Sequence, residues 1–423
     1  MTPLNEMSAR EAAHRLAARE VTAEQMARAC LERVAAREAV VGAWIHLDPE
    51  AALAQARRLD AGPVRGPLHG LPIGVKDLID TVDMPTCYGS PIYAGHRPRS
   101  DAACVALARA AGAVILGKTV TTEFAWFHPG KTANPRNPAH SPGGSSSGSA
   151  AAVADCMVPL AFGTQTAGST VRPASFCGIV GYKPTFGTIA RTGAKPLSDS
   201  LDTIGVLARS PADAAFLAGA LSGRALLGAP LPGAPRIGLC RTHEWKHARP
   251  ESASALDHAA QRASRAGAKV AERALPAPYA GLLQAQIDVM DYEAYGALAG
   301  ERLGHAEEMS AKLRQMLENA SKVDAGRYDA ALALAARCRA MQAEAFGDAD
   351  VLMTPSAPGE APKGLAATGD PVFCRIWTLL GNPSINVPCT TGPNGLPVGV
   401  QLVGRIGEDA RLVAAAEWLQ AAI

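Results

Sequence analysis

Short apolar runs that alternate with helical segments constrain the fold of this chain more than any other feature. The runs begin at residue 71 and are bounded by Gly, Pro or Asp, as is typical of strands that are buried on both faces. They occupy residues 71–75, 113–116, 157–162, 204–207, 236–239, 351–353, 384–387 and 398–403. Helical periodicity fills residues 102–111, 145–155, 211–221 and 253–266 between them. The alternation predicts an α/β fold, with an α/β/α layered core around a large mixed, mostly parallel central sheet.

Two further segments are helical in pattern. Residues 8–11 (Ser-Ala-Arg-Glu) and 22–25 (Thr-Ala-Glu-Gln) both fit the capping box that starts a helix, so we expect residues 1–60 to form N-terminal helices. Residues 277–346 are rich in Ala, Leu and Glu and carry few turn signals, which predicts a helical insertion over the sheet and a candidate lid. No internal repeat divides the chain, and we expect residues 1–423 to form a single domain.

The charge pattern argues against nucleic-acid and membrane partners. The 41 basic and 39 acidic residues are interspersed and leave a net charge of +2, so there is no basic footprint for nucleic acid or an anionic surface. The first 20 residues carry Glu6, Arg10, Glu11 and Arg15 where a signal peptide needs an apolar block, and no segment offers about 18 uncharged apolar residues. We therefore expect a cytoplasmic protein.

The cysteines also indicate a cytoplasmic protein. There are nine, an odd count, and they are scattered without a Cys-x-x-Cys pair. Disulfide frameworks and zinc sites have regular spacings, so these residues are predicted to be reduced thiols, most of them in the core. They are Cys30, Cys87, Cys104, Cys156, Cys177, Cys240, Cys338, Cys374 and Cys389.

Residues 243–247 (His-Glu-Trp-Lys-His) match the zinc-protease pattern H-E-x-x-H. That pattern needs both histidines on one face of an established helix. A strand-like run at 236–239 precedes the match and Pro250 follows it closely, which leaves no room for the helix. We expect no metal in this protein.

Residues 112–119 match the phosphate-loop pattern G-x-x-x-x-G-K-[ST] letter for letter. In a phosphate loop the strand comes before the first Gly, and the loop opens a helix whose N-terminus holds phosphate. Here the apolar run lies inside the pattern, and Lys118 is expected to begin a loop. We predict neither nucleotide binding nor any other cofactor.

Two stretches of small residues place serines where main-chain N–H groups can gather around one point. Residues 143–149 read Gly-Gly-Ser-Ser-Ser-Gly-Ser, and residues 163–170 read Gly-Thr-Gln-Thr-Ala-Gly-Ser-Thr. A developing oxyanion needs such N–H groups. A flexible linker is disfavoured because the first stretch runs directly into the apolar residues 150–154.

A catalytic serine needs a base within hydrogen-bond reach. No histidine has an evident acidic partner in the sequence, and the chain has no G-x-S-x-G elbow, which disfavours an α/β-hydrolase triad. Lys76 follows the apolar run at 71–75, and strand ends are where the sites of α/β sheets collect. An exposed lysine that closes a strand is the alternative interpretation of this position.

These segments resemble the amidase signature family. The likeness extends over most of the chain and is carried by residues 70–77, 143–173, 176–185, 200–205 and 395–404. It implies a serine amidase that hydrolyses a small carboxamide or a urea-like amide such as biuret or malonamate, through an acyl-enzyme, releasing ammonia or an amine. The alternative that it implies is a protein like the A subunit of glutamyl-tRNA amidotransferase, a glutaminase that depends on a partner subunit. A homodimer is a further expectation from the family.

The resemblance also assigns roles to residues. It makes Ser169 the nucleophile, Lys76 the base and Ser145, after a cis peptide with Gly144, the serine that passes protons between them. Lys76 must be neutral to act, which requires burial away from carboxylates. The main-chain N–H groups that would form the oxyanion hole belong to Thr166, Ala167, Gly168 and Ser169.

The expected substrate contacts come from Arg172, Gln165 and Gly144. Arg172 would clamp a substrate carboxylate, or else order the loop as a structural arginine. Gln165 stands where the family often has Asp, and Ala167 stands where it often has Gly. The pocket walls are expected to include Trp126, Phe127, Phe373 and Trp377, together with the helical segment 277–346.

Overall fold

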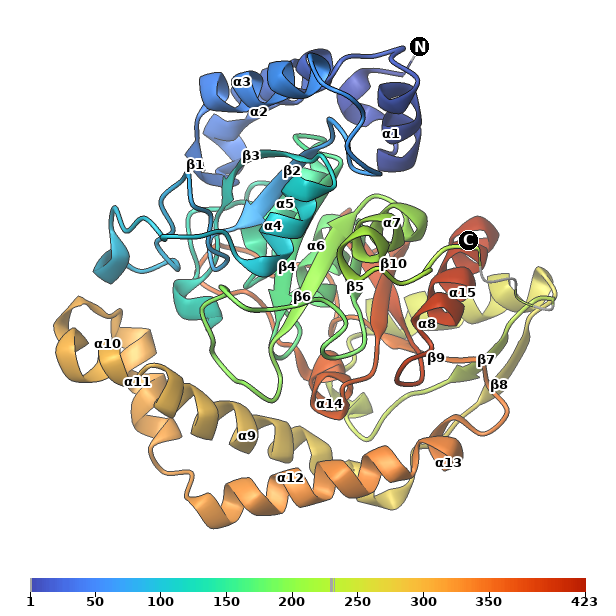
Figure 1. Cartoon of the computed structure of the whole chain (residues 1–423). Coiled ribbons are helices and arrows are strands. Elements are labelled where there is room, and N and C mark those ends of the chain that lie inside the picture. Colours follow the sequence, from blue (N-terminus) through green and yellow to red (C-terminus); the bar gives the residue numbers. More distant parts are fainter. Residues whose placement is uncertain (1, 229–230, 232) are drawn as a thin grey trace.

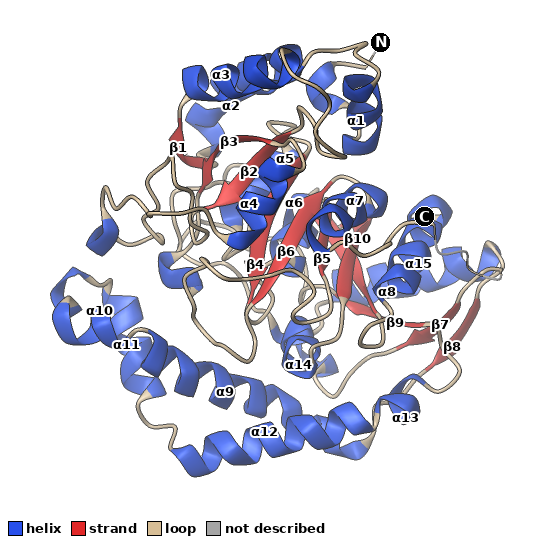
Figure 2. Cartoon of the chain, in the orientation of Figure 1, coloured by secondary structure: helices blue, strands red, loops and turns tan. Residues whose placement is uncertain are grey.

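A single sheet runs through the middle of the protein, as Figures 1 and 2 show. The computed structural model describes residues 2–228, 231 and 233–423. Within these residues eleven strands pair in the order β1-β3-β2-β4-β6-β5-β10-β11-β9-β7-β8. The strands are β1 (Trp44–Leu47), β2 (Pro72–Lys76), β3 (Val114–Thr119), β4 (Leu160–Gln165), β5 (Val180–Lys183), β6 (Thr203–Ala208), β7 (Arg236–Leu239), β8 (Lys269–Glu272), β9 (Val351–Pro355), β10 (Ser384–Thr391) and β11 (Pro397–Val403).

The sheet is mixed, as predicted, but it is not mostly parallel. Of the ten pairings among the described strands, β2–β3, β2–β4, β7–β8 and β7–β9 are parallel and the other six are antiparallel. The prediction of a parallel majority is wrong because several neighbours are joined directly rather than through a crossover helix. β10 and β11, for example, are separated by only a short turn, which forces them to run antiparallel.

The helices cover both faces of the sheet (Figure 2). Their bounds are α1 (Ala9–Ala17), α2 (Ala23–Val41), α3 (Pro49–Asp60), α4 (Ala103–Ala110), α5 (Ser147–Ala154), α6 (Val171–Cys177), α7 (Pro211–Ser222), α8 (Pro250–Arg265), α9 (Leu282–Ala297), α10 (Ala299–Gly304), α11 (Ala311–Ala320), α12 (Ala325–Ala340), α13 (Gln342–Phe346), α14 (Val372–Leu380) and α15 (Asp409–Ala422). Short 3-10 helices are η1 (Leu4–Glu6), η2 (Pro91–Tyr93), η3 (Glu123–Ala125), η4 (Trp245–His247), η5 (Ala277–Gly281) and η6 (Ala306–Glu308).

The first 60 residues hold η1, α1, α2 and α3, with β1 between the last two helices. Thr22 and Gln25 form the complete capping box at the start of α2, each side chain bonding the other's backbone N–H. At the start of α1 only half of the predicted box is present. The Ser8 hydroxyl accepts from the Glu11 N–H, but the Glu11 carboxylate binds Arg15 at 2.7 Å instead of returning to Ser8.

Residues 277–346 are helical over most of their length and comprise η5, α9–α13 and η6. In Figure 1 these helices form a separate flank, on the side of the sheet away from α1–α3. Their apolar side chains pack against α14 and residues 124–126 in one buried cluster, which includes Leu282, Val289, Trp377 and Trp126. The segment therefore packs against α14 and residues 124–126.

The two rejected motifs are not sites of the kind that their patterns describe. Lys118 does not begin a loop, because β3 continues through Gly117 and Thr119, and its fully buried Nζ lies 3.1 Å from Asp77 Oδ1. At residues 243–247 the structure has a turn and the short η4 in place of an α-helix. No group of three or more His, Cys, Asp or Glu side chains in the described chain could hold a metal ion.

All nine cysteines are free, and six of them are buried. No helix among the described residues is both long enough and apolar enough to cross a membrane.

Candidate active site

Lys76 is the last residue of β2, which lies between β3 and β4 inside the sheet. All five residues of this strand are buried, and the Lys76 side chain is 0% exposed. Its Nζ donates to Ser145 Oγ at 2.7 Å and to Thr164 Oγ1 at 2.5 Å. No carboxylate in the described chain pairs with it. The lysine thus ends in a pocket of hydroxyl groups and does not close the strand at the surface.

The surroundings of Lys76 favour its neutral form. Burial lowers the pKa of its amine from 10.5 to about 7, while the Asp202 carboxylate acts in the opposite direction. A charged amine without a partner is costly to bury, and the proton is given up instead. About half of the molecules therefore carry a neutral Lys76 amine at pH 7.

Ser145 follows a cis peptide bond with Gly144, as the family resemblance predicts, and lies just before α5. The small residues of this stretch are explained by close backbone contacts. A Cβ atom on Gly148 would lie 2.2 Å from the Ala43 carbonyl oxygen, and one on Gly143 would lie 2.8 Å from Pro173 Cα. Larger residues would push the stretch away from its neighbours, so glycine fixes the position of Ser145.

Ser169 lies in the buried turn between β4 and α6. Its carbonyl accepts a hydrogen bond from the Ser146 N–H at 3.3 Å, which places it beside the residue that follows Ser145. Its hydroxyl makes no hydrogen bond within the described residues. The structure thus joins Lys76 and Ser145 directly and holds Ser169 next to them through the backbone.

Gln165 fixes the turn that carries Ser169. Its Oε1 accepts from the N–H groups of Thr170 at 2.9 Å and Val171 at 3.1 Å, and its Nε2 donates to Thr378 Oγ1 at 3.0 Å. Thr378 in turn donates to the Ala167 carbonyl at 2.8 Å. Because these bonds occupy the fully buried side chain, Gln165 positions the turn and does not face a substrate.

The N–H groups of Ala167, Gly168 and Ser169 have no hydrogen-bond partner in the described chain. The next two N–H groups are the ones that Gln165 binds. Three adjacent free donors in a buried turn are the arrangement that can hold an oxyanion.

Asp202 is a site residue that the sequence analysis missed as such, although it lies within the matching block at 200–205. Its Oδ1 accepts from Thr166 Oγ1 at 2.6 Å, and its Oδ2 accepts from the N–H groups of Leu197 and Ser198 at 2.8 and 3.0 Å. Asp202 therefore anchors the first residue of the same turn. Burial raises the pKa of its carboxyl, and these hydrogen bonds lower it.

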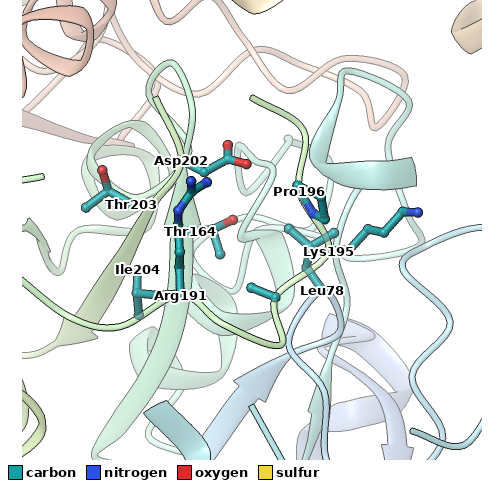
Figure 3. Close-up of a pocket in the computed structure, with 9 residues that line it drawn as sticks. Leu78, Thr164, Arg191, Lys195, Pro196, Asp202, Thr203 and Ile204 are labelled. Atoms are coloured by element: carbon teal, nitrogen blue, oxygen red, sulfur yellow. The ribbon is translucent and has the colours of Figure 1, made fainter. Parts of the chain in front are cut away.

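Asp202 and Thr164 line a small cavity (Figure 3). Its volume of about 20 Å³ is enough for one water molecule. Thr164 was also missed, but its position offers a signal. It lies near the end of β4, which runs parallel to β2, so both Thr164 and Lys76 reach the same edge of the sheet.

Arg172 is 1% exposed and binds backbone carbonyls. Its Nη1 donates to Gly369 O at 2.6 Å, and its Nη2 donates to Gly144 O at 2.6 Å and to Thr368 Oγ1 at 3.4 Å. Burial lowers the pKa of its guanidinium to about 10. Of the two expected uses of Arg172, the geometry favours the structural one, in which it holds the residue before Ser145.

The expected wall residues Trp126, Phe373 and Trp377 are buried, and Phe127 is half-buried. Phe127 has two cations over its ring: the guanidinium carbons of Arg172 and Arg375 each lie 5.8 Å from the ring centroid. Sequence reasoning missed Arg375, which gives no local signal in the helical pattern of α14.

Comparisons with known proteins show the family and the fold of the chain. The family model described as Amidase matches residues 25–413. The A subunit of glutamyl-tRNA(Gln) amidotransferase from Cupriavidus necator is 35% identical, with 98% of this chain and 96% of that protein covered. Among solved structures, an amidase matches with a TM-score of 0.89 and 32% identity over 98% of this chain and 99% of its own. A peptide amidase from Stenotrophomonas maltophilia matches with a TM-score of 0.82 and 30% identity over 99% and 97%.

Proposed function

Because the chain belongs to the amidase family and is an amide-hydrolysing enzyme, we propose that it hydrolyses a small linear carboxamide or urea-like amide through a serine acyl-enzyme. The observation that carries the proposal is the buried contact between Lys76 Nζ and Ser145 Oγ. A lysine with a pKa of about 7 can accept a proton near neutral pH, which an ordinary lysine cannot.

In the proposed first step, Ser169 Oγ attacks the amide carbonyl. Its proton passes to Ser145, whose own hydroxyl proton passes to neutral Lys76. The N–H groups of residues 166–169 hold the resulting oxyanion, and the absence of other partners for those of Ala167, Gly168 and Ser169 in the described chain supports this role. This arrangement is a variant of the Ser-His-Asp catalytic triad in which a lysine serves as the base.

In the proposed second step, Ser145 gives its proton to the leaving nitrogen as the C–N bond breaks, and the Lys76 ammonium returns a proton to Ser145, which leaves Lys76 neutral again. Ammonia or an amine departs, and the acyl group stays on Ser169. Water then attacks the ester with Lys76 again as the base, which releases the acid and restores the serine. For a primary amide the sum is one amide plus one water, giving one carboxylate and one ammonium ion.

A reactive fluorophosphonate tests the proposal without knowledge of the substrate. We expect it to label Ser169, as located by peptide mass spectrometry, and we expect Lys76→Met to abolish labelling. Lys183→Met is the matched control, because Lys183 is also fully buried and burial also lowers its pKa to about 7. Its Nζ, however, donates to the Pro184 carbonyl and makes no hydrogen bond to a serine in the described chain. Labelling that survives in Lys76→Met, or falls equally in the control, would remove Lys76 from the mechanism.

The similarity to the A subunit of the amidotransferase supports a second candidate function, a glutaminase that depends on a partner protein. The two candidates differ in what the purified chain can do alone. Steady release of ammonia from small amides by the isolated chain favours the first, and activity that needs an added partner favours the second.

We further propose a cytoplasmic location, since all nine cysteines are free. Assembly as a homodimer stays an expectation from the family, and light scattering of the purified protein measures it directly.

A further inference from the structure

Arg375 is a buried cation without a counter-ion. It lies on α14, its exposed fraction is 8%, and no carboxylate in the described chain lies within 4 Å of its guanidinium. The one hydrogen bond it makes there runs from Nη1 to Gln286 Oε1. Burying an unpaired charge is costly, so a protein keeps such a residue where something else compensates the charge.

A second arginine lies against the same aromatic ring. The guanidinium carbons of Arg375 and Arg172 are each 5.8 Å from the centroid of Phe127. Burial lowers the pKa of both, and Arg375 lowers that of Arg172 further. The carboxylates of Asp291 and Asp370 raise the pKa of Arg375 from a distance, but neither forms an ion pair with it. The positive charge of Arg375 therefore has no carboxylate in direct contact to compensate it among the described residues.

The two arginines differ in their free donors. Both Nη atoms of Arg172 bind backbone carbonyls, whereas Arg375 uses only Nη1. The remaining donors of Arg375 form the planar fork that matches a carboxylate in a bidentate contact. Arg375, rather than Arg172, has the hydrogen-bonding capacity to take an anion.

Arg375 lies beside the turn that carries Ser169. A Cβ atom on Gly168 would lie 2.8 Å from Pro371 Cβ and 3.1 Å from Cys374 Cβ, so the start of α14 touches this turn. Gln286, which accepts from Arg375, also donates to the Thr166 carbonyl at 3.0 Å. Through its Nη1 and Gln286, the Arg375 guanidinium is thus linked to the first residue of the candidate oxyanion turn.

We propose that Arg375 binds a carboxylate on the substrate, so that the enzyme prefers small primary monoamides of dicarboxylic acids to neutral amides. The inference rests on the proposed amidase function. Because the leaving group of a primary amide is ammonia, the carboxylate belongs to the acyl part. The reaction is then ⁻OOC–(CH2)n–CONH2 plus water giving ⁻OOC–(CH2)n–COO⁻ plus NH4⁺.

Binding tests the anion site without catalysis. Malonate, succinate and glutarate, which mimic the product, are titrated calorimetrically into Ser169→Ala and into the double variant that adds Arg375→Gln. We expect at least one dicarboxylate to bind Ser169→Ala, and its affinity to fall about 10- to 100-fold in the double variant, the range for losing a hydrogen bond to a charged group. Absence of binding to Ser169→Ala, or equal binding by both proteins, overturns the inference.

Two further variants test whether a loss of affinity reflects the Arg375 side chain or a general loss of folding. Arg375→Lys keeps the charge but loses the fork, and we expect an intermediate affinity. Arg411→Gln removes an exposed arginine of α15 that binds only Glu408 in the described chain, and we expect it to leave the affinity unchanged. Thermal unfolding of each variant shows whether it is folded. A loss of affinity in Arg411→Gln equal to that in Arg375→Gln would overturn the assignment to Arg375.

Measuring the turnover of acidic and neutral amides tests the anion site separately from the serine mechanism. Ammonia release is compared for malonamate, succinamate and glutaramate and for propionamide, butyramide and valeramide, in which a methyl group replaces the carboxylate. We expect kcat/KM to favour one of the acids in the wild type by at least about tenfold and Arg375→Gln to lose that preference. An enzyme that is labelled at Ser169 but prefers neutral amides refutes the anion site alone. Dicarboxylate binding without labelling refutes the serine mechanism alone.

Discussion

The pH dependence of the reaction is the most direct consequence of the buried lysine. Lys76 acts as a base only when it is neutral, and burial brings its pKa to about 7. The neutral fraction is then about 0.1 at pH 6 and about 0.9 at pH 8. We therefore expect kcat/KM to rise about tenfold from pH 6 to pH 8 and to level off above that, since no further deprotonation of Lys76 remains.

The assay is ammonia release at subsaturating substrate across this pH range, with whichever of the six amides is turned over fastest. A second buried group titrates in the same window, because burial also lowers the pKa of Lys183 to about 7. The Lys183→Met variant removes that group. We expect the variant to keep the acid limb of the profile with the same midpoint.

Two results would refute the reasoning. A profile that is flat between pH 6 and pH 8 would show that the rate does not depend on a group with the pKa of Lys76. An acid limb that disappears in Lys183→Met would show that the limb belongs to Lys183 instead. Solvent-exposed lysines titrate near pH 10.4, so they cannot imitate a midpoint near 7.

Two further predictions concern the surroundings of the site. Asp202→Asn removes the carboxylate that raises the pKa of Lys76, so we expect the midpoint of the acid limb to move below 7, and a midpoint that stays or rises would contradict the coupling. Gly148→Ala places a Cβ atom 2.2 Å from the Ala43 carbonyl oxygen and should destabilise the fold by about 1–3 kcal/mol or more, seen as a lower Tm. Gly296→Ala in α9, where nothing lies within 4 Å of the added atom, is the control and should leave Tm unchanged or raise it.

The sequence predicted eight of the eleven described strands and missed β1, β5 and β8; β5 is buried along its whole length but has only four residues, Val-Gly-Tyr-Lys. All eight predicted runs overlap strands of the sheet. β8 (Lys-Val-Ala-Glu) lies at the edge of the sheet and is mostly exposed, and β1 (Trp-Ile-His-Leu) at the other edge has one buried residue in four, so neither carries the signal of a buried strand. Strand direction was mispredicted because pairing depends on connections between elements and not on local period.

The residues of the candidate site also fall into those that the sequence could predict and those that it could not. Lys76 was accessible to sequence reasoning because it ends an apolar strand, and the stretch around Ser145 was accessible because its small residues let main-chain N–H groups gather around one point. Asp202 and Arg375 were not, because their roles depend on contacts across the fold: Asp202 with Thr166, and Arg375 with Gln286, which is 89 positions away. From the sequence alone, a charged residue in a helical pattern is predicted to face solvent. Its burial becomes evident only when the position of the neighbouring helix is known.

The free N–H groups of residues 167–169 require the contacts that surround them. A buried donor without a partner costs about 1–3 kcal/mol, so a turn left to itself would rearrange to satisfy these groups. Gln165 holds the N–H groups that follow the turn, Asp202 holds the side chain of its first residue, and Arg172 holds the carbonyl before Ser145. Each of these anchors is bonded to more than one partner, and Gln165 and Arg172 are almost fully buried, so the turn cannot relax without breaking several hydrogen bonds at once. Such a turn keeps its donors aimed at the position where negative charge develops, and reorganisation during the reaction is avoided.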